Sequence, residues 1–232
     1  MADQNGPKHR PIRSFVRREG RLTPGQERAL TELLPRYTVE PGEQPLDMQA
    51  IFGNSNPVVM EIGFGNGRLL AQQAQQHPEF NFIGLEVHRP GVGHLLLQLQ
   101  EHATENVRIL NQDAMEVLSR HIPAQSLYAL WLYFPDPWPK KKHHKRRIVN
   151  QRFLDLVMNS LQDNGVLHMA TDWQDYAEHM QAAVTEHGQF SKLDPSALPD
   201  DYPFLRPATH FEQRGRRKGH VITDLYFRIN DT

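Results

Sequence analysis

The chain has 232 residues and a formal net charge of −1, a length that can bury one sizeable core and is short for two. It contains no cysteine, which excludes disulfides, thiolate nucleophiles and cysteine-ligated metal clusters. No apolar run approaches the length of a membrane span and the first residues, MADQNGPKHRP, are polar, so we expect a cytoplasmic protein with no membrane partner. The 13 histidines form no HExxH pair or other metal spacing, and we expect no metal.

The small net charge hides an uneven distribution along the chain. Residues 1–21, 138–152 and 206–219 together hold 18 of the 26 Lys and Arg residues and only 3 of the 27 Asp and Glu residues. If the fold gathers these segments on one surface, that surface suits a polyanion, and we favour nucleic acid. The alternative is that each segment is a solvated face or tail.

The first predicted element is a helix that starts after Thr23. Thr23 can cap it, Pro24 suits the first helical position, and Gln26 completes a capping box. The helix should end near Pro35. We therefore divide the chain into residues 1–40, a basic N-terminal arm with this first helix, and residues 41–232, the main domain.

Strand and helix patterns then alternate through the main domain. We expect a glycine turn and a helix over 68–76 after the first strand, a helix through 95–103, a helix from 149 to the Asn164-Gly165 pair, and a last helix from about Trp173. The expected strands are 58–63, 81–87, 107–110, 128–134, 166–171 and 221–229. This order predicts a mostly parallel α/β sheet with helices on both faces, which binds ligands beyond the carboxyl ends of its strands.

Four acidic residues lie at or shortly after those strand ends: Glu61, Glu86, Asp113 and Asp136. Any one of them could be a helix cap or a surface residue. Their corresponding places on four strands indicate a binding site.

The turn after the first strand reads Gly63-Phe64-Gly65-Asn66-Gly67. Glycines let the backbone adopt positive φ and approach a ligand closely. A dinucleotide fingerprint would need a third glycine at position 68, where Arg68 stands. Because Glu86 is placed to accept hydrogen bonds from a ribose, and acids suit a cationic sulfonium, S-adenosylmethionine is the leading cofactor.

Seven segments carry a resemblance to a known family. EIGFGNG, GLEVH, NQDA, LYFPDPWPKKKHHKRR, MATDW, THFEQRG and TDLYFR resemble, in this order, the bacterial tRNA (guanine-N7)-methyltransferases from about Arg13 to Phe227. FPDPWPKK and THFE are the most specific. The resemblance implies a Rossmann-like class I methyltransferase fold, with a mostly parallel seven-stranded sheet, helices on both faces and one antiparallel C-terminal strand. It implies methylation of guanine N7 at position 46, in the variable loop of tRNA.

The resemblance also implies roles for individual residues. Asp136 is the expected catalytic residue, and His210 stands where lysine is usual in the family. The expected S-adenosylmethionine site consists of Glu61, Gly63, Gly65, Gly67, Glu86, Asp113 and Asp136. The expected substrate contacts are Lys140, Asp172, Thr209, His210, Phe211 and Glu212. From the charge pattern, phosphate contacts are expected from Lys141, Lys142, Lys145, Arg146 and Arg147.

The chemistry of guanine N7 explains the acid beside the basic run. N7 carries a lone pair and no proton, so methylation needs no base to deprotonate it, and positioning should lower the barrier most. Pro135 and Pro137 restrict the backbone on either side of Asp136. Trp138 or Phe211 could stack on the extruded base, and a core role for Phe211 is equally open.

Three other functions remain open, as do a monomer and a homodimer. A nicotinamide-dependent oxidoreductase would bind its cofactor at the same turn. A non-catalytic RNA-binding module would explain the basic segments but not the four acids. A methyltransferase for a small metabolite would leave the basic segments unused.

Overall fold

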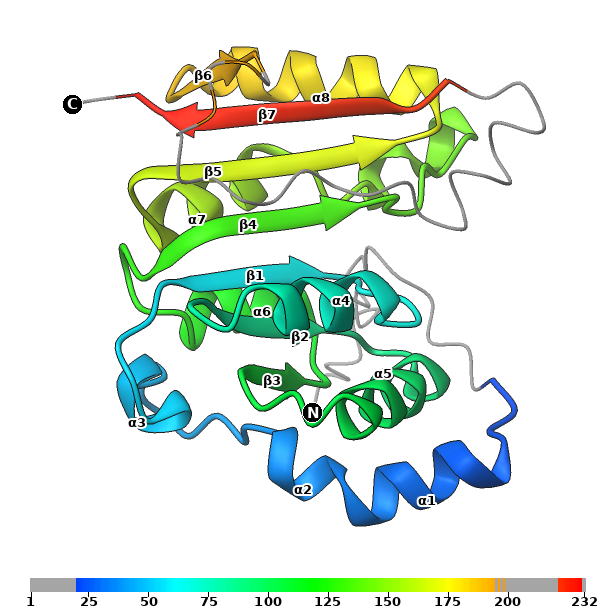
Figure 1. Ribbon diagram of the computed structural model, residues 1–232. Helices are drawn as coiled ribbons and strands as arrows, with labels where there is room; N and C mark the ends of the chain where they lie inside the picture. The colour runs from blue at the N-terminus through cyan, green and yellow to red at the C-terminus, as the bar shows by residue number, and fades with distance from the viewer. Residues whose placement is uncertain (1–19, 195, 197, 199–220, 231–232) are drawn as a thin grey trace, which may run out of the picture.

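The computed structural model describes residues 20–194, 196, 198 and 221–230. Within them, seven strands form one sheet in the order β3-β2-β1-β4-β5-β7-β6 (Figure 1). Strands β1 to β5 pair in parallel, and β7 runs antiparallel to both of its neighbours, β5 and β6. The expected fold class is therefore confirmed. The strands are β1 (Val58–Ile62), β2 (Asn81–Leu85), β3 (Val107–Leu110), β4 (Leu127–Tyr133), β5 (Leu161–Thr171), β6 (Phe190–Leu193) and β7 (Thr223–Ile229).

Helices cover both faces of the sheet (Figure 1). Alternate residues of a strand point to opposite faces, so Met60 of β1 lies in one hydrophobic cluster and Val59 in the other. The first cluster packs against α3 (Met48–Phe52), α6 (Ala114–Arg120), α7 (Gln151–Ser160) and α8 (Gln174–His187). The second packs against α1 (Pro24–Glu32), α2 (Leu34–Tyr37), α4 (Arg68–Gln76) and α5 (Arg89–Glu101). No helix among the described residues has the length and apolarity to span a membrane.

The predicted capping box at the start of α1 is present. The Gln26 backbone N–H donates to Thr23 Oγ1 at 3.3 Å, and the Thr23 backbone N–H donates to Gln26 Oε1 at 2.9 Å. The helix ends at Glu32, however, and Pro35 lies in the first turn of α2, where a helix does not need its missing N–H. Because Ala29 and Leu30 are buried in the second cluster, α1 is part of the core, and the boundary at residue 40 stays a prediction.

The expected end of α7 at Asn164-Gly165 was wrong. The helix ends at Ser160 and β5 begins at once with Leu161, which is buried opposite Leu127. The β4–β5 register shifts between Leu127 and Ala129, and Asn164 has a φ of 62°. Asn164 and Gly165 thus form an irregularity inside β5. A turn signal in the sequence alone does not distinguish such an irregularity from a helix end.

Candidate active site

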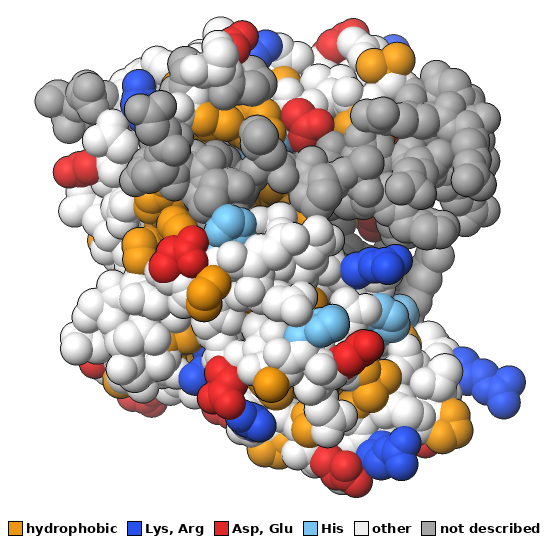
Figure 2. All heavy atoms as spheres, in the orientation of Figure 1, with side chains coloured by type: hydrophobic (Ala, Val, Ile, Leu, Met, Phe, Trp, Pro, Cys, Tyr) orange, Lys and Arg blue, Asp and Glu red, His pale blue; other side chains and the backbone are white. Residues whose placement is uncertain are grey.

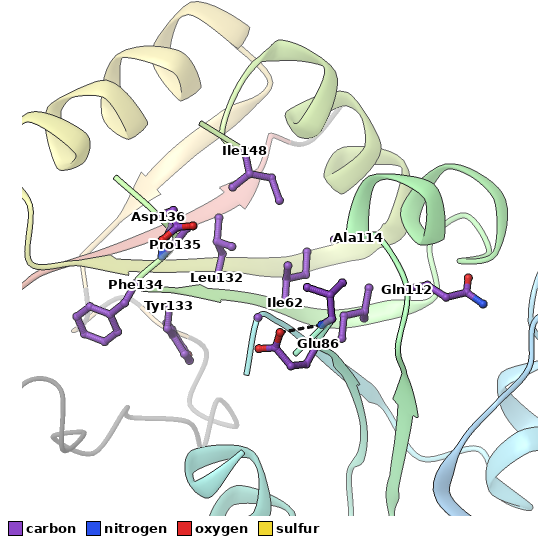
Figure 3. A pocket seen from close by; sticks show the side chains of 13 residues that line it. Ile62, Glu86, Gln112, Ala114, Leu132, Tyr133, Phe134, Pro135, Asp136 and Ile148 are labelled. Atoms are coloured by element: carbon purple, nitrogen blue, oxygen red, sulfur yellow. Dashed lines mark hydrogen bonds between the residues drawn. The ribbon is translucent and has the colours of Figure 1, made fainter. Parts of the chain in front are cut away.

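A cavity of about 240 Å³ opens beyond the carboxyl ends of β1, β2 and β4 (Figure 3). This is the edge at which a parallel sheet binds its ligands. The lining residues are Ile62, Gly63, Leu85, Glu86, Val87, Gln112, Ala114, Leu132, Tyr133, Phe134, Pro135, Asp136 and Ile148. In the close-up view, Glu86 and Asp136 border different sides of this space, with Ile62 and Leu132 between them.

The glycine loop between β1 and α4 borders open space. Gly63 and Gly65 have φ values of 73° and 60°, and a Cβ added to either would meet no atom within 4 Å. The loop also packs tightly on the start of α5, because a Cβ at Gly91 would lie 2.0 Å from the Gly65 carbonyl oxygen. Both the backbone conformation and this close approach require glycine. Because these residues have no side chains, the space beside the loop stays open for a ligand.

Glu86 follows β2 and ties the glycine loop to the start of α5. Its Oε2 accepts the Gly65 N–H at 2.9 Å, and its Oε1 accepts the N–H groups of Val87 at 2.7 Å and His88 at 2.9 Å. A carboxylate has about four acceptor positions. Glu86 therefore combines a structural role with a remaining capacity to accept a bond from a ligand hydroxyl.

Glu61 is buried in β1, only 4% exposed. Burial, followed by the nearby negative charge of Glu86, raises its pKa to about 8. Its Oε2 has no hydrogen-bond partner among the residues the structure describes. Glu61 does not line the cavity, although Ile62 and Gly63 after it do. An unpartnered buried carboxyl group is unfavourable by itself and is stabilised by a donor or a cation.

Asp113 is the N-cap of α6. Its Oδ1 accepts the N–H groups of Met115 at 2.9 Å and Glu116 at 3.3 Å. Its neighbours Gln112 and Ala114 line the cavity, whereas Asp113 does not. The structure therefore supports the capping alternative for this acid and leaves its cofactor role a prediction.

Asp136 lies at the rim of the cavity in a strained loop after β4. Phe134 and Trp138 on either side have φ values of 49° and 45°, a region that costs a non-glycine residue about 1–3 kcal/mol. The Phe134 N–H donates to the Ala170 carbonyl at 2.8 Å, which joins this loop to β5. Asp172 follows the end of β5 at the same edge of the sheet. Asp136 and Asp172 thus follow the carboxyl ends of two neighbouring strands, β4 and β5.

The basic run after this loop forms a 3-10 helix, η1 (Lys141–Arg146), which the sequence did not predict. Lys140, Lys141, Lys142 and Lys145 are exposed. The Arg146 guanidinium lies 4.8 Å from the centroid of the Trp138 ring. An exposed cationic helix therefore follows directly on the Asp136 loop.

Arg147 does not fit its expected role as a phosphate contact. It is 3% exposed, and its side chain donates hydrogen bonds to the Pro137 carbonyl and to Asp175. A guanidinium with these partners is buried against protein and not presented to RNA. Sequence reasoning missed this because position in a cationic run does not indicate the direction of a side chain.

Other predicted and unpredicted residues complete the site. Gln112, Tyr133 and Ile148 were not predicted and line the cavity. Tyr133 lies within the segment LYFPDPWPKKKHHKRR but carries no charge that would have distinguished it from a core residue, and its hydroxyl lies 2.8 Å from His168 Nδ1. The predicted substrate residues Thr209, His210, Phe211 and Glu212 lie outside the described residues, as do residues 1–19 of the first basic segment and all of the third, 206–219.

Comparisons with known proteins agree on one family. Residues 55–225 match the profile of a family described as "Putative methyltransferase". A tRNA (guanine-N(7)-)-methyltransferase of Nitrosococcus oceani is 49% identical over 219 residues, 94% of this chain and 91% of the relative. One of Alkalilimnicola ehrlichii, with the same name, is 52% identical over 223 residues, 94% and 93% of the two chains.

Solved structures show the same fold at lower identity. The 16S rRNA methyltransferase KamB is 16% identical with a TM-score of 0.54, over 81% of this chain and 96% of KamB. The antibiotic-resistance methyltransferase Kmr is 14% identical with a TM-score of 0.53, over 80% and 92%. On its sequence relatives, with the fold in agreement, this chain belongs to the tRNA (guanine-N(7)-)-methyltransferase family.

Proposed function

We propose that this chain is an enzyme that transfers the methyl group of S-adenosylmethionine to N7 of a guanosine in tRNA. The observation that carries this proposal is the Asp136 loop, which joins the rim of the cavity to the exposed cationic helix η1. One side of this loop can hold a small cofactor and the other can hold phosphate. The tRNA substrate implies a cytoplasmic enzyme.

The residues around the cavity fit S-adenosylmethionine. Glu86 can accept a hydrogen bond from the ribose, and the open space at Gly63 and Gly65 suits close approach of the backbone to the cofactor. The unpartnered Oε2 of Glu61 supports a role near the cationic end of the cofactor, since a nearby positive charge favours the ionised carboxylate. Asp113, the N-cap of α6, lies between the cavity-lining residues Gln112 and Ala114 and would be a further cofactor contact. The cofactor supplies an electrophilic methyl group.

The protein's part in the reaction is to position the guanine. Asp136 and Asp172 can accept hydrogen bonds from the N1–H and the exocyclic amine of guanine, and a carboxylate also stabilises the positive charge that forms on the methylated base. No residue has to remove a proton from N7. Ordering the base against the methyl group can therefore supply most of the acceleration.

The basic helix serves the RNA backbone. N7 faces the deep, narrow major groove of A-form RNA, so the base must be exposed or extruded before transfer. Lys141, Lys142 and Lys145 are exposed, and this exposure supports a role in binding the flanking phosphates. We also propose that Trp138 stacks on the base and that residues 209–212 contact the substrate.

The direct test is methylation of bulk tRNA that lacks 7-methylguanosine, with labelled S-adenosylmethionine and nucleoside analysis of the product. We expect label in 7-methylguanosine alone. Label in another nucleoside, or none in RNA, would contradict the proposal. Reduction and aniline cleavage of the product tRNA then map the modified base, which we propose is position 46 in the variable loop.

A second test concerns recognition of the guanine edge. Inosine lacks the exocyclic amine, so a substrate with inosine at the target position should be methylated more slowly by the wild-type enzyme. Asp172→Ala should narrow that difference. An unchanged preference in the variant would remove Asp172 from base recognition.

A further inference from the structure

Arg147 is a buried cation beside the candidate site whose function the basic run does not explain. Lys141, Lys142 and Lys145 before it are exposed, whereas only 2% of the Arg147 side chain is. A buried guanidinium is retained only where its donors are satisfied. Its contacts therefore indicate what it holds in place.

These contacts join three segments. The Arg147 Nε donates to the Pro137 carbonyl at 2.9 Å, and one terminal nitrogen donates to Asp175 near the start of α8 and lies 3.2 Å from His144 Nε2 in η1. The guanidinium carbon is also 4.8 Å from the centroid of the Tyr176 ring. Arg147 thus connects the Asp136 loop to η1 and to α8.

The Asp136 loop needs such an external contact. Pro135, Pro137 and Pro139 have no N–H to donate. Phe134 and Trp138 have left-handed backbone conformations, and such strain persists only where surrounding contacts compensate for it. On the β4 side, the Phe134 N–H bonds to Ala170. On the other side, the Pro137 carbonyl, next to Asp136, accepts its bond from Arg147.

Electrostatics agrees with this arrangement. The side-chain hydrogen bond from Arg147 lowers the pKa of Asp175, so this carboxylate remains ionised as the partner of the guanidinium. Burial raises the pKa of Tyr176 to about 12, with opposing contributions from the charges of Arg147 and Asp136. The charges of Arg147 and Asp136 therefore both act on Tyr176, and its hydroxyl stays neutral next to the guanidinium.

We propose that Arg147 is a positioning residue that fixes Asp136 at the rim of the cavity through the Pro137 carbonyl, with Asp175 as the ion that orients the guanidinium. The inference rests on the proposed function, because the place of Asp136 matters through its role toward the guanine. Lysine cannot replace this arginine fully, since a single ammonium lacks the planar array of donors that reaches Pro137 and Asp175 together.

The test compares Arg147→Met, Arg147→Lys and Asp175→Asn with Arg28→Met, which removes an exposed cation from α1, outside the three basic segments. We expect Arg147→Met to lower the single-turnover rate about 100-fold at saturating tRNA and cofactor, as for a misplacement of about 1 Å. Arg147→Lys and Asp175→Asn should lie between Arg147→Met and wild type. The dissociation constants for tRNA and S-adenosylmethionine should stay within about threefold of wild type, and Arg28→Met should keep the wild-type single-turnover rate.

Hydrogen exchange of residues 134–147 provides a readout independent of activity. We expect faster exchange at Asp136 and Trp138 in the Arg147 and Asp175 variants, whether or not the wild-type protein methylates tRNA. The inference would be overturned if all three variants kept the hydrogen exchange and the single-turnover rate of the wild-type protein. A loss confined to tRNA affinity would also overturn it. If Arg147→Met does not fold, the other two variants decide. An inactive wild-type enzyme would instead count against the proposed function.

Discussion

The four acids predicted at the strand ends have four different surroundings. Glu61 is buried with an unpartnered oxygen, Glu86 accepts three backbone N–H groups, Asp113 caps a helix and Asp136 is exposed. Burial and hydrogen bonding change what a carboxylate can do far more than its place in the chain does. Each acid therefore calls for its own experiment.

Glu86 should control cofactor affinity. In Glu86→Ala the ribose loses an acceptor and the glycine loop loses its tie to the start of α5, so S-adenosylmethionine should bind about 10- to 150-fold more weakly, as for one hydrogen bond to a charged group. Titration calorimetry measures this effect, and tRNA affinity should not change. Glu116→Ala, an exposed acid on α6, is the matched control. Equal cofactor affinity in the two variants would remove Glu86 from the site.

Asp136 should control turnover. Asp136→Asn keeps the shape of the side chain and removes the charge that stabilises the methylated guanine, so we expect the single-turnover rate to fall about 100- to 1000-fold. Binding of tRNA, measured by filter retention, should persist because the lysines of η1 are intact. Near-normal methylation by this variant would refute the catalytic assignment.

At the scale of elements, the 3-10 geometry of η1 determines which basic side chains lie on the same side of the helix. Side chains three residues apart eclipse in such a helix, so Lys142 and Lys145 share one side of η1. Arg147 comes just after its end and is buried. The run therefore divides into exposed cations and one cation that packs inside the protein.

The exposed lysines should account for much of the salt dependence of tRNA binding. For about four to six phosphate contacts, the slope of log affinity against log salt should be about −3 to −5, and each lysine should contribute about 0.7–0.9. Replacing Lys141, Lys142 and Lys145 with alanine should make the slope shallower by about two to three units and weaken the binding of all tRNAs alike. The choice of guanine should remain. An unchanged slope would show that η1 is only a solvated face.

At the scale of the whole molecule, part of the surface carries positive and negative side chains side by side. Figure 2 shows Lys and Arg side chains among Asp and Glu side chains over the α1, α2 and α5 region. Arg28, Glu32 and Arg36 are exposed there, and Arg36 pairs with Glu105. Such a mixed surface has little attraction for RNA. Of the three basic segments, the structure describes 138–152, and gathering of all three on one face stays a prediction.

The stability of the cofactor-free protein should depend on pH through Glu61. The folded protein keeps the Glu61 proton up to about pH 8, whereas the unfolded chain releases it near the ordinary value of 4.5. Between these values the unfolded state binds fewer protons, so the contribution of Glu61 to the free energy of unfolding falls as pH rises. Glu61→Gln should therefore gain stability relative to wild type from pH 5 to pH 8.

Urea denaturation at pH 5, 6.5 and 8 without cofactor checks this prediction. Glu101→Gln changes an exposed glutamate at the end of α5 and should show no such trend. A constant difference between Glu61→Gln and wild type across these pH values would contradict the raised pKa.

Much of the secondary structure followed from local patterns, and the short elements did not. The six expected strands all exist, and Thr23 and Gln26 form the predicted cap. The helices α3 and α6, the 3-10 helix η1 and the strand β6 were not predicted. Each has four to seven residues, too few for a clear periodicity, and such short segments depend on tertiary packing for their stability.

The sequence by itself determined the fold class and the family and predicted the edge of the sheet at which the cavity lies, because hydrophobic periodicity, glycine turns and the motif around Asp136 are local in the chain. Only the tertiary structure decided which acid is buried, which caps a helix and which borders the cavity. It also separated Arg147 from the exposed lysines. These differences arise from segments distant in sequence: the Pro137 carbonyl and Asp175 meet the same guanidinium, and Glu61 lies near enough to Glu86 for their charges to interact. Burial and charge interaction depend on distances in space, which local patterns do not contain.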